Sequence, residues 1–251
     1  MDNFTSESWF KARYHFTIDA SVTDDALKSM QAVIERPDQW SVKLNGKEMT
    51  PASDKWWLDR YFPVYEIGAL IKKGENIIEL SAPKMTVFSE LMPVYILGDF
   101  NLENAAKGFL IKPATNPGLH SWKEKGLPFY GDKVSYSKTF TVVEPSGEFQ
   151  VQLGPWKGAV AEVWVNGKNA GNIGWAPYQL DVSRFIQKGE NLVEVRISGS
   201  LKNTLGYHHV VQSGWIDSPF SWNQGPVKQP SGSEYQFLDY GLFKEFSLMK
   251  R

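Results

Sequence analysis

The sequence predicts an all-β fold of two tandem antiparallel β-sandwiches, one over residues 1–112 and the other over residues 113–251. Three observations lead to this prediction. Short runs of alternating apolar and polar residues recur along the 251 residues, as in strands that bury one face. The same strand–turn–strand pattern occurs in both halves. A segment rich in proline and glycine, residues 113–132, is the expected crossing between them.

The first half contains alternating runs separated by turn residues, and one ambiguous segment. Residues 24–36, DDALKSMQAVIER, can be read as a helix. We favour a short turn of helix followed by a strand, because QAVIE leads to Pro37 and then to a hairpin. Strands are expected at 12–18, 30–35, 93–98 and 107–112.

The repeat contributes two turns and two strands to each half. In each copy an Asn-Gly pair follows alternating residues, and this pair accepts the positive φ of a type I′ hairpin turn at little cost. KKGEN and QKGEN predict a second tight turn before a half-buried strand. Glu66 and Asp181 occupy matching places, which favours a shared structural task over catalysis. The first copy covers 40–49 and 66–82, and the second covers 161–170 and 181–197.

Within the repeat, Asn45 corresponds to Asn166 and Asn76 to Asn191. We interpret the repeat as a structural unit that is used twice. The rest of the second half is expected to consist of a loop-rich segment, 199–235, and of strands at 134–143, 148–153 and 236–248.

Composition and charge exclude several classes of function. Lys and Arg number 27 against 28 Asp and Glu, a net charge of −1, and there is no basic run. Nucleic acid and an anionic membrane are therefore not expected partners. No apolar run approaches the roughly 20 residues that cross a bilayer. The chain has no cysteine, so it has no disulfide and no thiolate site. No signal peptide is visible at its start.

The aromatic content, 14% with 10 Trp, exceeds what core packing usually requires, because each buried indole needs a partner for its N–H. Trp175 and Tyr178 flank Pro177 after a glycine-rich stretch. The C–H face of a pyranose fits such rings, and nearby glycines let a ligand approach closely. The alternative is that both rings close the end of the sandwich core.

Three further segments combine aromatic and polar residues. LKNTLGYHH offers Asn203 and His208 to sugar hydroxyls, or to hydrogen bonds that tether a loop. SGWIDSPFSWNQG contributes Trp215 and Trp222, and DKWWLDRYFP contributes Trp57 as a weaker member. Packing against a neighbouring domain is the alternative for both of these segments. A zinc site is not expected, since the other histidines are distant in sequence.

The stretch VWVNGKNAGNIGWAPYQLDVSRFIQKGENLVEVRISGSLKNTLGYHH resembles the galactose-binding-like sugar-binding sandwiches (jelly rolls) of large glycoside hydrolases. The nearest groups are the family 2 type and, for the C-terminal region, the α-L-rhamnosidases of family 106. PVYILGDF, LPFYGDKVSYSKTF and YQFLDYGLF are similar to the C-terminal regions of such enzymes. Sandwiches of this type often carry a structural calcium ion, but no loop of the EF-hand kind is present, and no cofactor is expected.

The resemblance implies a non-catalytic role, since the catalytic barrel of such enzymes needs about 250 residues of its own. We therefore expect a carbohydrate-binding or architectural region of a larger glycoside hydrolase, active in polysaccharide degradation. Its partners would be an oligo- or polysaccharide and the catalytic domain of a parent enzyme, secreted or periplasmic through the parent polypeptide. Two alternatives stay open: a purely structural spacer, and an autonomous glycosidase. For the latter no motif selects a carboxylate pair.

Overall fold

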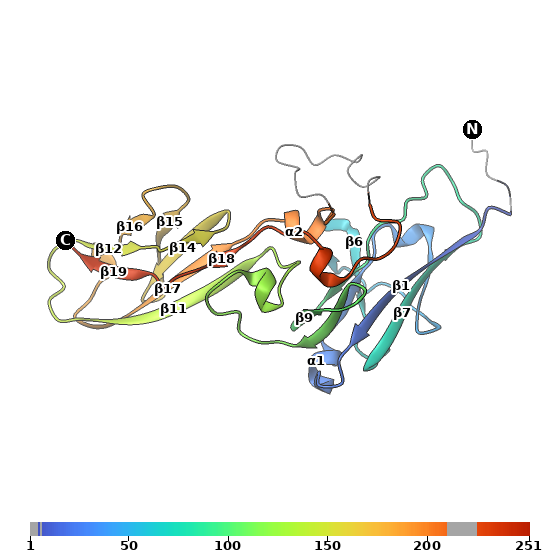
Figure 1. Ribbon diagram of the computed structural model, residues 1–251, viewed down its shortest axis with the longest axis horizontal. Coiled ribbons are helices and arrows are strands. Elements are labelled where there is room, and N and C mark those ends of the chain that lie inside the picture. Colours follow the sequence, from blue (N-terminus) through green and yellow to red (C-terminus); the bar gives the residue numbers. More distant parts are fainter. Residues whose placement is uncertain (1–4, 6, 210–224) are drawn as a thin grey trace. The chain divides into compact units, whose positions relative to one another are not determined.

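Strands make up most of the regular structure in the computed structural model, which describes residues 5, 7–209 and 225–251 (Figure 1). The chain divides into two compact units, Met1–Thr115 and Asn116–Arg251. Each unit has its own sheets and its own hydrophobic core. Within the described ranges, no helix has the length and apolar character needed to cross a membrane.

Unit 1 contains a six-stranded sheet in the order β4-β3-β7-β1-β10-β9 and a four-stranded sheet in the order β5-β6-β2-β8. The strands of the first sheet are β1 Phe10–Ile18, β3 Ser41–Leu44, β4 Lys47–Glu48, β7 Gly74–Ala82, β9 Phe100–Asn104 and β10 Phe109–Pro113. Those of the second are β2 Gln31–Val33, β5 Trp56–Trp57, β6 Asp59–Glu66 and β8 Tyr95–Leu97.

One strand pair of unit 1 departs from the expected antiparallel order. Strands β1 and β10 pair in parallel, with Thr17 opposite Leu110 and Ile18 opposite Ile111. Most of the unit separates these two strands in sequence, so no hairpin turn dictates their relative direction. The other strand pairs recorded in this unit are antiparallel.

The ambiguous segment of unit 1 forms a short helix and then a strand, which confirms the favoured interpretation. Helix α1 spans Asp24–Lys28, and the Thr23 hydroxyl caps it by accepting from Ala26 N at 3.2 Å. Strand β2 follows, and then the 3₁₀ turn η1 at Pro37–Gln39. The core of the unit draws on both sheets, with Val42 and Ile78 from the larger and Ala32 and Tyr65 from the smaller.

Unit 2 contains three sheets, in the orders β11-β17-β14-β15, β16-β12-β19 and β13-β18. Val163 and Val195 of the first sheet share one core with Val151 of the second and Leu242 of the third. The strands are β11 Lys133–Val142, β12 Phe149–Gln152, β13 Trp156–Lys157, β14 Val160–Val165, β15 Lys168–Ile173, β16 Gln179–Asp181, β17 Gly189–Ser198, β18 Gly241–Leu242 and β19 Ser247–Lys250. The helical turns are η2 Trp122–Lys125, η3 Ser183–Phe185, α2 Lys202–Leu205 and η4 Gly232–Glu234.

The repeated Asn-Gly pairs form the expected turns. Asn45 and Asn166 both have a φ of 51°, and Gly46 and Gly167 have φ values of 84° and 78°. Positive φ at both central residues is the signature of a type I′ hairpin turn. The turns join β3 to β4 in unit 1 and β14 to β15 in unit 2.

The asparagines of the repeat also form a hydrogen-bonded pair in unit 2, of which Asn191 is buried. Asn166 Nδ2 donates to Asn191 Oδ1 at 2.9 Å, while Asn166 Oδ1 accepts from Leu192 N at 3.0 Å. Asn191 Nδ2 donates to the carbonyls of Gln187 and Gly189 at 2.8 and 3.1 Å, and its Oδ1 accepts from Gln187 N at 2.9 Å. The Asn191 side chain is fully buried and fastens the turn before β17 to the hairpin.

Unit 1 repeats this arrangement bond for bond. Asn45 Nδ2 donates to Asn76 Oδ1 at 2.9 Å, and Asn45 Oδ1 accepts from Ile77 N at 3.0 Å. Asn76 Nδ2 donates to the carbonyls of Lys72 and Gly74 at 2.6 and 3.1 Å, and its Oδ1 accepts from Lys72 N at 2.9 Å. The repeat is therefore a structural unit that satisfies the same buried backbone groups twice.

Glu66 and Asp181 do not share a task, which corrects the expectation. Asp181 Oδ1 accepts from the backbone N and the hydroxyl of Ser183, at 2.9 and 2.6 Å, and so closes a turn. Glu66 instead pairs with Lys55 at 2.6 Å and accepts from Gln31 at 3.0 Å. The difference is local, because the residue two positions after Glu66 is a glycine and offers no hydroxyl.

The expected strand at 236–248 is wrong for most of its length, since only 241–242 and 247–248 of it are strand. Two short strands, β18 and β19, occupy this segment with irregular chain around them. The chain bends at Gly241, where φ is 132° and an added Cβ would lie 2.4 Å from the carbonyl oxygen of His120. Only glycine fits such a close approach, so the strand cannot run straight through.

Candidate functional site

The loop at 174–178, here called the aromatic loop, joins β15 to β16 in unit 2. It contains a cis peptide bond between Ala176 and Pro177. The carbonyl of Tyr178 accepts from Leu153 N at 2.9 Å, and Gln179 N donates to the carbonyl of Pro177 at 2.7 Å. These bonds tie the end of the loop to the chain segment that follows β12.

The two rings of the aromatic loop differ in their surroundings. Trp175 is 82% exposed, whereas Tyr178 is 44% exposed. The Tyr178 ring packs edge-on against Trp156, with 5.6 Å between centroids and 83° between planes. An added Cβ at Gly174 would meet no atom within 4 Å, so the space beside Trp175 is open. Tyr178 is therefore anchored, while the Trp175 ring is presented to solvent and does not close the core of this unit.

Trp156 packs against the aromatic loop, and the sequence analysis did not identify it as a candidate residue. It lies on β13 and is partly buried. Its indole Nε1 is buried and has no hydrogen-bond acceptor within the described part of the chain. The motif GPWKG around it looks like an ordinary turn, and only the ring contact with Tyr178 reveals the association.

Asn203 has a structural position that corrects its expected role in ligand binding. It is 2% exposed, and both ends of its side-chain amide are bonded to one residue. Asn203 Nδ2 donates to the carbonyl of Leu238, and Leu238 N donates to Asn203 Oδ1, both at 2.9 Å. This pair of bonds fastens α2 to the chain before Asp239, which leaves the amide of Asn203 no surface to offer to a sugar.

His208 belongs to the same buried group. Its Nε2 donates to the carbonyl of Asn203 at 2.8 Å, and its ring lies 5.1 Å from Phe129 and 4.8 Å from Phe237. Burial lowers the pKa of His208 below its usual 6.5, so the imidazole is neutral at pH 7. Its bond to a backbone carbonyl matches the loop-tethering alternative.

The remaining sequence-predicted residues lie elsewhere. Trp215 and Trp222 fall outside the described residues. Trp57 belongs to unit 1, where its ring lies 5.2 Å from Tyr95 and 6.5 Å from Phe62. Across residues 7–209 and 225–251, no group of three or more His, Asp or Glu side chains is placed to hold a metal ion.

Asp239 is the most strongly perturbed carboxylate of unit 2. It accepts from Ser121 Oγ at 2.8 Å and pairs with Lys157 Nζ at 2.9 Å and Lys123 Nζ at 3.0 Å. Burial alone would raise the pKa of Asp239, but the bonds from Lys157, Lys123 and Ser121 outweigh it and lower the pKa to about 2. A carboxylate that stays ionised at all ordinary pH values is a structural anchor and unsuited to donate a proton.

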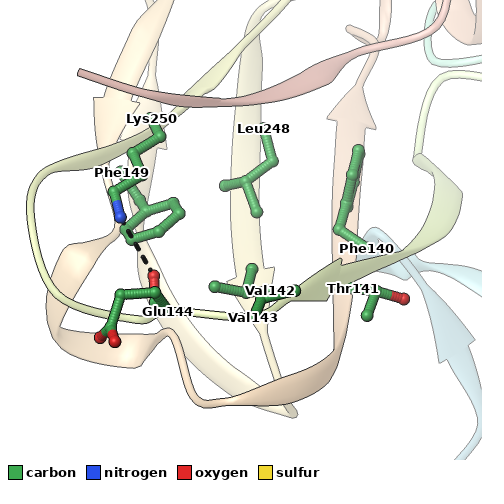
Figure 2. Close-up of a pocket in the computed structure, with 8 residues that line it drawn as sticks. All are labelled: Phe140, Thr141, Val142, Val143, Glu144, Phe149, Leu248 and Lys250. Carbon is green, nitrogen blue, oxygen red and sulfur yellow. Dashed lines mark hydrogen bonds between the residues drawn. The ribbon is translucent and has the colours of Figure 1, made fainter.

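A shallow hollow of about 380 Å³ lies at the end of unit 2 where β11 ends (Figure 2). Phe140, Val142 and Leu248 contribute apolar side chains to it. Lys250 Nζ at its rim donates to the carbonyl of Glu144 at 3.2 Å. None of the sequence-predicted residues lines this hollow, so it is separate from the aromatic loop.

Comparison with known proteins relates the chain to parts of larger enzymes. No family model matches it. A putative beta-glucuronidase from Formosa agariphila is 30% identical over 127 residues, which cover 48% of this chain and 11% of the relative. The match therefore spans about a tenth of the length of that protein, and the chain is similar to a region of a glycoside hydrolase.

Solved structures resemble the chain only at low similarity. A rhamnosidase from Novosphingobium sp. PP1Y has a TM-score of 0.36 at 19% identity, covering 94% of this chain and 24% of that one. A Bifidobacterium dentium beta-glucuronidase, complexed with coumarin-3-O-glucuronide, has a TM-score of 0.34 at 15% identity, covering 59% and 28%. At these TM-scores the likeness says nothing further about the chemistry of the chain.

Proposed function

We propose that this chain is a non-catalytic, carbohydrate-binding region of a larger glycoside hydrolase, built from two tandem galactose-binding-like sandwiches. The sequence similarity to part of a putative beta-glucuronidase supports the enzyme context. The chain divides into two units, and each unit has its own sheets and its own hydrophobic core. This division supports the proposal of two tandem sandwiches. The proposed partners are an oligo- or polysaccharide and the catalytic domain of the parent enzyme, which is secreted or periplasmic.

The exposure of Trp175 is the observation that carries the proposal. An indole that is 82% exposed leaves a large apolar face in water, and large exposed apolar side chains gathered with a second ring often mark a binding surface. Tyr178 is a second exposed ring of the same loop, held against Trp156, and Gly174 leaves the approach open. The face of a pyranose ring can lie on Trp175, with its C–H groups against the π face.

A purely structural spacer is the second candidate, although the exposure of Trp175 counts against packing of this ring within the chain. Trp is enriched at the centres of protein interfaces, so Trp175 would then be covered by the catalytic domain. The two candidates differ in what the isolated chain does. A spacer has no affinity for glycans once its partner domain is absent, whereas a binding region keeps its affinity.

Affinity electrophoresis through gels that contain soluble polysaccharides tests the proposal. The wild-type chain should be retarded by at least one polysaccharide, and Trp175→Ala should weaken this retardation about tenfold. One face of an aromatic ring is roughly a third of the 150–250 Å² that such a side chain buries, which at about 25 cal/mol per Å² amounts to about 1.5 kcal/mol.

Trp9→Ala is the matched control, because Trp9 is also a highly exposed indole, at 65%, but lies in unit 1. It should leave the retardation unchanged. Equal loss in both variants, or no retardation of the wild type by any polysaccharide in a broad panel, would contradict carbohydrate binding by the aromatic loop. The second of these results is the one expected of a spacer.

A further inference from the structure

The smaller sheet of unit 1 buries apolar side chains on the face that points away from the core. Val33 and Val64 are 0% and 5% exposed and lie directly opposite each other in the pairing of β2 with β6, yet neither belongs to the core cluster. Their neighbours Ala32 and Tyr65 do belong to it. Because successive residues of a strand point to opposite faces, Val33 and Val64 lie on the outer face, and other side chains must cover them there.

Three rings lie on this outer face, here called the aromatic trio: Trp57 of β5, Phe62 of β6 and Tyr95 of β8. Tyr95 is paired with Val33, and Phe62 is two residues from Val64, so both side chains share the face of the valines. Ring centroids are 5.2 Å apart for Trp57 and Tyr95, 6.2 Å for Phe62 and Tyr95, and 6.5 Å for Trp57 and Phe62. The three rings are in mutual contact and all are partly exposed.

Glu35 lies beside the aromatic trio. It follows Val33 by two residues, and the bond from Arg36 N to the carbonyl of Tyr61 at 3.1 Å holds this segment beside the end of β6 that carries Phe62. Its closeness to Tyr95 is also evident, because burial and then the charge of Glu35 raise the pKa of the Tyr95 phenol. A carboxylate and three rings therefore share one surface.

The Glu35 carboxylate has an unusual environment. Burial raises its pKa, and the charges of Glu90 and Asp59 add to this effect, against an opposing contribution from Arg36. The guanidinium of Arg36 is itself held by both oxygens of Asp38, at 3.0 Å each. Among the described residues, none donates a hydrogen bond to Glu35 or forms an ion pair with it. Within the part of the chain that the structure describes, Glu35 is thus a partly exposed carboxylate whose oxygens are open to a donor from a ligand.

We propose that the aromatic trio and Glu35 form a saccharide site in unit 1 that takes an uncharged pyranose. The C–H face of the sugar lies on the rings, and one of its hydroxyls donates to Glu35. A hydroxyl donor meets the unmatched acceptor, and the carboxylates of Asp59 and Glu90 disfavour an acidic sugar by like-charge repulsion. The site belongs to unit 1 and does not depend on Trp175, so it goes beyond the function proposed for the aromatic loop.

Saturation-transfer NMR with the purified chain tests this site. The probes are the methyl glycosides of glucose, galactose, mannose, xylose and rhamnose, with methyl glucuronide as the acidic probe. All variants carry Trp175→Ala, which weakens binding at the aromatic loop about tenfold, so that the added Trp57 and Glu35 substitutions report on unit 1. This background protein should still receive saturation transfer to at least one neutral glycoside, and less to the glucuronide. Added Trp57→Ala should weaken the affinity at least tenfold, and added Glu35→Gln about threefold or more, since a bond to a charged acceptor is roughly twice as strong as a neutral one.

Trp56→Ala is the matched control for Trp57→Ala. Trp56 is the adjacent residue, is 54% exposed and forms none of the ring pairs of the aromatic trio, so its removal should leave the affinity unchanged. Glu35→Gln keeps the size of the side chain and gives a reading even if Trp57→Ala fails to fold. The proposal is overturned if the Trp175→Ala protein binds no neutral glycoside, which is the result expected if the face packs against another protein domain. It is also overturned if Glu35→Gln leaves the affinity unchanged, or if the glucuronide binds as well as the neutral sugars.

Discussion

Replacement of Asn191 by alanine removes the centre of the asparagine pair in unit 2. The side chain makes four hydrogen bonds, two as donor and two as acceptor, and is fully buried. At about 1 kcal/mol for each net hydrogen bond, the expected loss in the free energy of unfolding is about 4 kcal/mol. A loss of this size is a large part of the 5–15 kcal/mol that typically holds a domain folded.

Urea denaturation followed by tryptophan fluorescence measures this loss. Asn172→Ala is the control, since Asn172 is an exposed asparagine on β15 of the same sheet, and its loss should stay within about 0.5 kcal/mol. Asn76→Ala should lower the stability of unit 1 by a similar amount, because it breaks the equivalent bonds there. A loss below about 1 kcal/mol for Asn191→Ala would refute the reasoning that these bonds fasten the repeat.

Three further predictions concern unit 2. Asp239→Asn should lower the free energy of unfolding by about 2 kcal/mol at pH 7. Because a lowered carboxyl pKa stabilises the folded state only above that pKa, the difference from wild type should vanish as the pH falls from 3.8 to about 2. Urea titrations at several pH values check this. The pKa of His208 is lowered in the folded state, so the unfolded chain binds a proton more readily, and stability should decrease as the pH falls below 6.5. This decrease should be absent in His208→Phe. Thermal unfolding of both proteins measures it. Gly171→Ala should lower the free energy of unfolding by about 1–3 kcal/mol, since φ is 142° and the added Cβ would lie 3.2 Å from Leu180. Gly174→Ala should be nearly neutral, because an added Cβ there meets no atom within 4 Å. Equal effects of the two substitutions in urea titrations would contradict this.

Features that depend on neighbouring residues could be predicted from the sequence. The type I′ turns follow from the Asn-Gly pairs, and the short helix before β2 follows from Thr23 and the acidic residues after it. Alternating residues indicated β1 and β11 within two residues of their bounds. The repeat itself is visible, because the same turn chemistry has to appear twice if the same buried groups are to be satisfied twice.

The two-residue strands β5 and β13, in contrast, could not be predicted. Each contains too few residues to show an alternation. Strand β13 pairs with the distant strand β18, and β5 pairs with the adjacent strand β6 through an irregular register. Trp156 was missed for this reason: its association with Tyr178 depends on the packing of β13 and is not visible in the local sequence.

The sequence by itself determined the local conformations and the types of side chain available, since φ preferences, hydrogen-bonding groups and ring faces belong to individual residues and their near neighbours. Only the tertiary structure decided which of these groups are used internally and which are presented to solvent. Asn203 suits a sugar by its chemistry, but Leu238, 35 residues away, takes both of its amide groups. Trp175 is 82% exposed, and the charge of Glu35 acts on Tyr95, which lies 60 residues further along the chain. Burial and pairing depend on contacts between distant segments, and these form only when the chain folds.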